Sequence, residues 1–237
     1  MAEADALVAG VGEIGEPIAQ VLEKAWRVAR LDVDLEPDVE RAKYLHVCYP
    51  FQIDDFVGTT KTYAERYSPS ALIVHSTVLP GTSDWLQEEI AQPVFYSPVR
   101  GKHRDMLNDL VRYKKFLAGP ESRIDEVGEH MMQAGFQVEK MIGTKALEVA
   151  KLLETTYFGV LIAWAQETER YAKAVGADYQ TVNRFIEEID FLPDNYHPGY
   201  IGGHCVMPNI ELLQELRRSA VLDFVQASND QFSQEAD

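Results

Sequence analysis

The sequence predicts an α/β protein in which a doubly wound parallel sheet is followed by a long central helix and a small helical C-terminal region. In the first part of the chain, short apolar runs alternate with turn residues and stretches of helical spacing, which is typical of such a sheet. Residues 144–174 then contain almost no helix breaker, which predicts one long helix. The change after Gly143 indicates two domains, residues 1–143 and residues 144–237.

The first domain is expected to begin with a strand, a glycine turn, a helix and a second strand. Residues 6–9 are a short apolar run, residues 18–26 carry apolar side chains at helical spacing, and residues 27–34 return to a strand pattern. Further elements are a helix at residues 83–91 and strands at residues 44–50, 71–78, 93–99 and 114–120. Because strands alternate with helices, we expect parallel strands with helices on both faces of the sheet.

The second domain is expected to be helical around one loop. After the long helix, residues 178–190 form a shorter helix, and residues 192–209 are a loop with prolines and glycines that holds Cys205. Residues 210–225 have a helical pattern again. The polar residues 226–237 are expected to be frayed.

Charge and cysteine content exclude several classes of protein. A formal net charge of −16 over 237 residues argues against nucleic acid as a partner. The two cysteines, Cys48 and Cys205, lie far apart and outside any cluster with metal-ligand spacing, so we expect neither a disulfide framework nor a metal site. The sequence has no signal-peptide pattern and no apolar run of membrane-spanning length, so we expect a cytoplasmic protein that does not bind membranes.

A glycine turn follows the first strand. Gly10, Gly12 and Gly15 fit the pattern G-x-G-x-x-G between a strand and a helix. In such a turn the first glycine allows the sharp bend, the second lets backbone amides approach a pyrophosphate, and the third lets the helix pack on the strand. The helix N-terminus adds amide donors and a positive dipole end. The pattern predicts a Rossmann-like domain that binds a dinucleotide.

An acidic residue at the end of the second strand indicates which dinucleotide is bound. Asp32 follows Gly15 by 17 residues, where a carboxylate can accept hydrogen bonds from the ribose hydroxyls of NAD. A carboxylate at this place repels the 2′-phosphate of NADP, whereas the nearby Arg30 argues in the opposite direction. Asp34 is an alternative for the same role. We expect NAD as the cofactor.

Two further positions carry reactive groups. Lys151 on the long helix has Glu154 three residues on and Thr155 four residues on, so the three side chains share one helix face. They either point together into a site, or Lys151 and Glu154 form an ordinary surface pair. Cys205 is either a nucleophile on a glycine loop or a buried, inert thiol.

Five stretches of the chain resemble, in order, the UDP-glucose/GDP-mannose dehydrogenase family. They are GVGEIGEPIA, HSTVLPGTS, YSPVRG, AKLLETTYFGVLIAWAQETERYAKAVGAD and GYIGGHCVMPN. The resemblance covers nearly the whole chain. It implies an oxidoreductase of the nucleotide-sugar dehydrogenase type, in which a sugar primary alcohol is oxidised to a carboxylate with two NAD. It also implies a homodimer formed through the long helix, whose apolar content exceeds what one face needs.

The resemblance assigns roles to residues. Cys205 is implied as the nucleophile that forms a thiohemiacetal and then a thioester, and Lys151 as the cation that stabilises oxyanionic intermediates. Ser76 and Thr77 are implied to lie near the nicotinamide, with Thr77 also among the catalytic residues. The three glycines and Asp32 are implied to hold the adenosine half of NAD.

The chain departs from the family pattern at the positions of three polar residues. Val99 stands where the family has the glutamate of an S-P-E motif, Thr155 where it has asparagine, and Asn209 where it has aspartate. We keep Thr155 and Asn209 among the catalytic candidates. Because Asn209 cannot act as a carboxylate base, Glu154 or His204 is considered for acid–base work.

The resemblance also implies a C-terminal domain that binds the sugar nucleotide, and we expect this chain to be a truncated form without it. The leading expectation is a minimal dehydrogenase whose reaction ends at the carboxylate, at the aldehyde, or with transfer of the acyl group. One alternative is a hydroxyacid dehydrogenase of the 6-phosphogluconate-like type, in which Cys205 has no role. Another is an NAD-binding regulatory subunit without catalysis.

Overall fold

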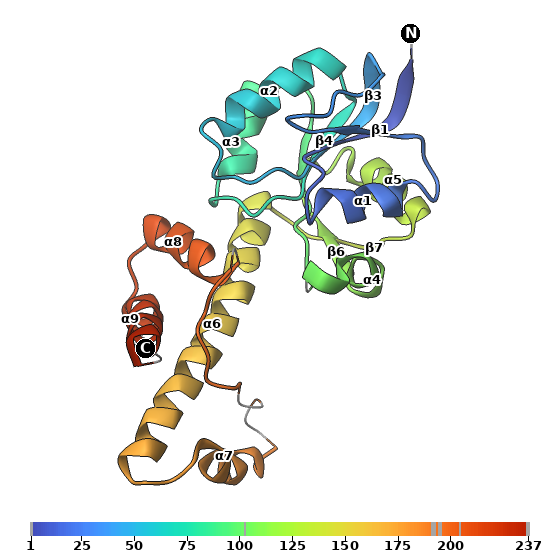
Figure 1. Cartoon of the computed structure of the whole chain (residues 1–237). Coiled ribbons are helices and arrows are strands. Elements are labelled where there is room, and N and C mark those ends of the chain that lie inside the picture. Colours follow the sequence, from blue (N-terminus) through green and yellow to red (C-terminus); the bar gives the residue numbers. More distant parts are fainter. Residues whose placement is uncertain (1, 102, 191–192, 194–195, 204, 236–237) are drawn as a thin grey trace. The chain divides into compact units, whose positions relative to one another are not determined.

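The computed structural model describes residues 2–101, 103–190, 193, 196–203 and 205–235. It separates into two compact units, Met1–Lys151 and Leu152–Asp237, which we describe one at a time (Figure 1). Within the described residues, none of the helices combines the length and the apolar character that crossing a membrane requires.

The first unit is built on a five-stranded sheet in the order β2-β1-β3-β4-β5. All of its strands are parallel, as the sequence predicts. The strands are β1 (Glu3–Ala9), β2 (Val28–Leu31), β3 (Arg41–Val47), β4 (Ala71–Val74) and β5 (Val94–Tyr96). All four residues of β4 are buried, which explains why it is a continuous apolar run. A second, two-stranded parallel sheet pairs β6 (Lys114–Leu117) with β7 (Gln137–Lys140).

Helices cover both faces of the large sheet, which confirms the predicted double winding. The helices of this unit before Thr144 are α1 (Gly15–Leu22), α2 (Phe56–Tyr67), α3 (Thr82–Glu89), α4 (Met106–Arg112) and α5 (Ile124–Ala134). Two clusters of buried apolar side chains lie against the sheet. One contains side chains of α2 and α3, and the other contains side chains of α1, α4 and α5.

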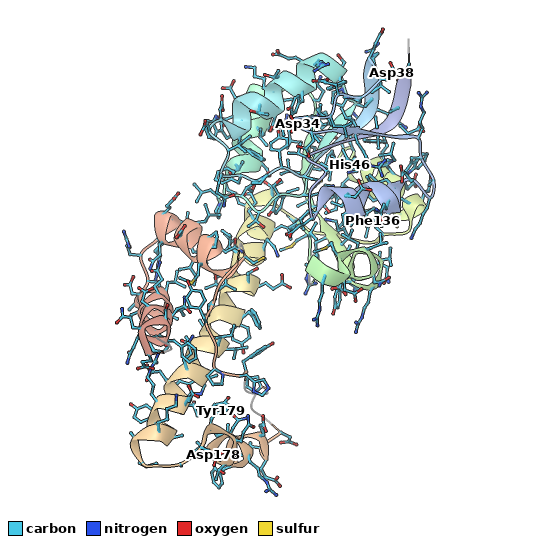
Figure 2. All side chains as sticks on the ribbon, in the orientation of Figure 1. Asp34, Asp38, His46, Phe136, Asp178 and Tyr179 are labelled. Carbon is cyan, nitrogen blue, oxygen red and sulfur yellow. The ribbon has the colours of Figure 1, made fainter. Side chains whose placement is uncertain are left out.

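The connection between β2 and β3 is short. Residues 32–40 join the two strands without a helix, although β1 lies between them in the sheet. Five of these nine residues are acidic, and Asp34 and Asp38 are labelled in Figure 2. The Rossmann-like arrangement is therefore trimmed on the β2 side.

The second unit is helical. The long helix α6 (Thr144–Ala174) has the predicted bounds and contributes its first two turns to the first unit. It is followed by α7 (Tyr179–Glu187), α8 (Val206–Leu216) and α9 (Ala220–Glu235). The prediction of one C-terminal helix with a frayed end is wrong. The helix α8 ends at Leu216, and a second helix, α9, continues to Glu235. Its inner side buries Leu222 and Val225, which stabilises it.

Candidate functional site

The strands of the large sheet end at a common edge, where the chain places most of the residues predicted to bind a cofactor. Gly10 follows β1, Asp32 follows β2, and Ser76 lies just after β4. The chain leaves β1 for β2 on one side and later returns to β3 on the other side. This reversal of strand order is the place where parallel α/β sheets bind ligands.

The glycine turn has the geometry that its pattern predicts. Gly10 has a φ of +86°, and a Cβ atom added there would lie 2.5 Å from the backbone nitrogen of Tyr49. A Cβ atom at Gly15 would lie 1.7 Å from the carbonyl oxygen of Gly10, so the start of α1 packs directly on the turn. At Gly12 an added Cβ atom would meet no atom within 4 Å. The turn thus leaves an open surface at its second glycine, as a pyrophosphate requires.

Asp32 is held against this turn. Its carboxylate accepts a hydrogen bond from the backbone N–H of Val11 (2.7 Å) and another from the N–H of Val33 (2.8 Å). Asp34 lies further along the loop and is exposed. Asp32 is therefore the acid that the fold joins to the glycine turn.

Arg30 is engaged by two carboxylates. Its guanidinium lies 2.8 Å from Glu16 and 2.6 Å from Glu23, and these hydrogen bonds raise the pKa of Arg30 above its usual value. The hydrogen bond to Arg30 also lowers the pKa of Glu16. Because its charge is already compensated, Arg30 is poorly placed to recognise a 2′-phosphate.

Ser76 and Thr77 lie in a loop at the end of β4. β4 ends at Val74, so the predicted strand over residues 71–78 is too long. The hydroxyl of Ser76 donates to the carbonyl oxygen of Tyr49 (2.6 Å), and Thr77 is half-buried. The candidate cofactor site therefore extends along the carboxyl ends of the strands from β2 to β4.

Lys115 is a buried amine at this edge that sequence reasoning missed. Its ammonium donates to the carbonyl oxygens of Ser97 and Pro98, the latter at 2.9 Å, and lies 3.0 Å from Nδ1 of His75. Desolvation, with a smaller effect from the charge of Lys151, lowers the pKa of Lys115 to about 7. A lysine at a buried position of a short strand, in the stretch KKFLAG, was the signal in the sequence.

Two other residues at the edge are packing residues. The side chain of Val99 is 6% exposed and lies in the apolar cluster that includes Met106 and Leu110. Desolvation raises the pKa of the Cys48 thiol to about 12, which makes this cysteine unreactive near neutral pH.

The second unit holds the cysteine loop at two points. The side-chain amide of Gln166, on α6, donates to the carbonyl oxygen of Gly199 (2.7 Å). Asn229, on α9, accepts from the N–H of Ile201 (2.7 Å) and donates to its carbonyl oxygen (3.2 Å). The hydroxyl of Ser228 bonds to Gln166 (2.8 Å), so α6 and α9 fix the loop together.

Cys205 is the N-cap residue of α8. Its carbonyl oxygen accepts from the N–H of Asn209 (3.3 Å), and the side chain of Asn209 is buried one turn along the helix. Val206 packs on α6 so closely that a Cβ atom at Gly159 would lie 2.6 Å from it. The left-handed φ of +79° at Gly203 gives the turn before the helix. Cys205 therefore lies at a helix N-terminus that packs on α6.

The polar residues of α6 differ in exposure. Lys151 and Thr155 are half-buried and Glu154 is exposed. Lys151 is the last residue of the first unit and Thr155 belongs to the second, on the same helix face as Gly159. His204 lies outside the described residues. Among the residues that the structure describes, no group of three His, Cys, Asp or Glu side chains is arranged to hold a metal ion.

Comparisons with known proteins give a family match over the second part of the chain. Residues 145–231 match the model of the UDP-glucose/GDP-mannose dehydrogenase family, central domain. A UDP-N-acetyl-D-mannosamine dehydrogenase of Methanocaldococcus jannaschii is 26% identical over 213 residues, which are 81% of this chain and 48% of that protein. The chain thus spans about half the length of this relative.

Solved structures support the fold along the whole chain. A UDP-D-ManNAc dehydrogenase from Pyrococcus horikoshii has a TM-score of 0.83 at 18% identity, and the match covers 96% of this chain and 68% of that one. A 3-hydroxyisobutyrate dehydrogenase of Mycobacterium tuberculosis has a TM-score of 0.76 at 14% identity, with 99% and 94% covered.

Proposed function

We propose that this chain, whose residues 145–231 match the UDP-glucose/GDP-mannose dehydrogenase family, is an NAD-dependent dehydrogenase that oxidises a primary alcohol on a sugar or nucleotide sugar. The observation that carries the proposal is the glycine turn, which is closed by packing at Gly10 and Gly15 and open at Gly12. The family match of the helix with Lys151 and of the loop with Cys205 supports the choice of substrate class.

The residues at the edge of the sheet fit NAD. The amides around Gly12 and the N-terminus of α1 would receive the pyrophosphate, and Asp32 would accept the ribose hydroxyls. Ser76 and Thr77 would lie beside the nicotinamide. NAD, when bound, accepts the hydride of each oxidation. The engaged state of Arg30 supports NAD over NADP.

Cys205 and Lys151 carry the proposed chemistry on the protein. In the first oxidation the alcohol carbon loses a hydride and its hydroxyl loses a proton, which leaves an aldehyde. The thiolate of Cys205 adds to the aldehyde carbon, and the oxygen takes a proton to give a thiohemiacetal. Loss of a second hydride and of that proton gives a thioester. The N-terminus of α8 favours the thiolate, and the charge of Lys151 favours the oxyanions.

The residues present are compatible with more than one fate of the thioester. Val99 is a core residue, and Asn209 has no carboxylate with which to activate water. Thr155 and Glu154 remain the polar groups of α6 that we include among the catalytic candidates. The product is therefore the carboxylate if water reaches the thioester, or a transferred acyl group if another nucleophile does. The reaction ends at the aldehyde if the second oxidation fails.

A homodimer is the assembly that we propose. The helix α6 exposes large apolar side chains over several turns, namely Leu153, Tyr157, Phe158, Trp164 and Tyr171. Exposed apolar area of this kind commonly marks a protein interface. Light scattering on purified protein is expected to give twice the mass of the 26.8 kDa chain, and a monomer at micromolar concentration would contradict the assignment.

Mass spectrometry tests the proposed covalent chemistry. The protein is mixed with NAD and UDP-N-acetylmannosamine or UDP-glucose, quenched within one turnover and digested. We expect a sugar acyl adduct on Cys205 and a carboxylate, aldehyde or acyl-transfer product in solution. Cys48→Ser serves as the matched control, because it removes the other cysteine and should leave the adduct unchanged. Full turnover in Cys205→Ser with none in Lys151→Ala would instead favour a hydroxyacid dehydrogenase.

A further inference from the structure

Three histidine rings and one lysine form a continuous chain of hydrogen bonds inside the first unit. Nζ of Lys115 lies 3.0 Å from Nδ1 of His75, and Nε2 of His75 lies 3.0 Å from Nδ1 of His46. Nε2 of His46 then lies 3.1 Å from Nε2 of His130. The four side chains are almost completely buried, and Figure 2 labels His46. Such a series of basic groups in an apolar core needs a physical explanation.

Each link in this chain joins one donor to one acceptor, so the tautomers of the rings are coupled. With Lys115 as an ammonium, it donates to Nδ1 of His75, and each following ring donates to the next as far as His130. With Lys115 as a neutral amine, the order is reversed: His130 donates to His46, and His46 donates to His75. Nδ1–H of His75 then donates to the carbonyl oxygen of Ser97, 2.7 Å away.

The two arrangements differ by one proton. When Lys115 passes a proton to Nδ1 of His75, the Nε2 proton of His75 moves to His46, and the Nε2 proton of His46 moves to His130. Nδ1 of His130 then releases its own proton. One proton enters at Lys115 and one leaves at His130, and all three rings are neutral before and after the shift.

The two ends of this hydrogen-bond chain lie at different levels along the strands. Lys115 bonds to the carbonyl oxygens of Ser97 and Pro98, just beyond the end of β5, and His75 directly precedes Ser76. His130 lies on α5 against the ring of Tyr44.

The surroundings of His130 mark the far end. Its Nδ1 has no hydrogen-bond partner within the described structure. The charges that act on the ring come from Lys43 on β3, Asp5 near the start of β1, and Glu126 on α5. These groups belong to the end of the sheet away from the glycine turn. Glu126 already accepts hydrogen bonds from Tyr44 and Arg123, so we assign the half-buried Asp5 as the acceptor of the proton that leaves Nδ1.

We propose that Lys115, His75, His46 and His130 form a buried proton path that carries protons away from the cofactor-binding edge of the sheet, toward the end at which Asp5 lies. The inference rests on the proposed function, because each alcohol oxidation leaves one proton at that edge for every hydride transferred. The four residues are positioning residues that act through one another, and none is assigned a contact with substrate.

The titration behaviour of the four groups supports the path. Desolvation lowers the pKa of Lys115 to about 7, so it can both accept and release a proton near neutral pH. Burial lowers the pKa of His130 to about 4 and holds those of His46 and His75 well below their usual value, which keeps all three rings neutral. The other titratable groups that act on Lys115 are Cys48 at the end of β3 and Lys151 on α6.

Nitrogen-15 NMR of histidine-labelled protein tests the path without any turnover. Between pH 6 and pH 9 we expect the rings of His75, His46 and His130 to exchange tautomers together, with one midpoint that is lost in Lys115→Met. In His46→Gln, His75 should still respond to pH and His130 should not. Tyr96→Phe is the control, since it removes a buried hydroxyl that has no hydrogen-bond partner within the described structure and does not belong to the proton path. Rings that keep one tautomer throughout, or a switch that persists in Lys115→Met, would overturn the path.

Kinetics then test its use in the reaction. If the path removes the reaction's proton, His46→Gln should lower kcat for NADH formation about tenfold or more with KM unchanged, whereas Tyr96→Phe should not. An unchanged kcat in a folded His46→Gln protein would overturn the role in catalysis. A coupled tautomer switch in a protein without any dehydrogenase activity would support the path and refute the proposed function, so the two failures are distinguishable.

Discussion

The buried amine of Lys115 should make the stability of the first unit depend on pH. Its pKa is about 7 in the folded protein, whereas an unfolded lysine has its usual value of 10.5. Between these values the unfolded chain binds one more proton than the folded chain, so the free energy of unfolding rises with pH. The full slope is about 1.4 kcal/mol per pH unit. Because the folded amine is half-protonated near pH 7, the expected gain from pH 7.0 to 8.5 is about 1.5 kcal/mol.

Lys115→Met removes this contribution while nearly conserving side-chain volume. Urea unfolding is followed by tryptophan fluorescence in a Trp164→Phe background, so that Trp26 and Trp85 report on the first unit alone. The difference in unfolding free energy between the two proteins should grow by about 1.5 kcal/mol in favour of Lys115 from pH 7.0 to pH 8.5. Cys48 titrates in the unfolded state over the same range, but it is present in both proteins and cancels. Parallel stability curves would refute the reasoning.

Three further changes have definite outcomes. Gly15→Ala should destabilise the first unit by about 2 kcal/mol or more in urea unfolding, because the added Cβ atom meets the carbonyl oxygen of Gly10 at 1.7 Å; an unchanged midpoint would contradict the packing. Gly12→Ala should leave stability within about 1 kcal/mol and weaken NAD binding by calorimetry, and unaltered affinity would argue against a pyrophosphate there. Glu148→Gln should lower the free energy of unfolding by about 2 kcal/mol, because the buried carboxylate accepts hydrogen bonds from Gly81 and Ser83 and an amide can accept fewer of them. A decrease below about 0.5 kcal/mol would be inconsistent with these bonds.

The part of the fold that sequence predicted depends on local patterns. The glycine turn, the buried strands and the helix over residues 144–174 each have a periodicity or spacing that one stretch of chain contains in full. The helix α2 was missed because Gly58 and several threonines interrupt its apolar face and are weak helix formers. Its start is fixed instead by the carboxylate of Asp55, which accepts from the N–H of Gly58.

The part that sequence did not predict depends on contacts between distant residues. His46 and His130 are 84 positions apart, and neither stretch of sequence indicates that their rings meet. The end of the chain was expected to fray because it is polar. The side chain of Asn229 on α9 instead forms hydrogen bonds with the backbone of Ile201. The local sequence of α9 does not show that this distant partner exists.

The most direct test of the account is NADH formation at 340 nm by the purified protein with NAD and a panel of nucleotide sugars, sugar phosphates and free sugars. We predict turnover with the nucleotide sugars in the wild-type protein and none in Cys205→Ser, with two NADH per substrate if the thioester is released. Tight binding of NAD without turnover on any of these substrates, and without alkylation of Cys205, would contradict the account.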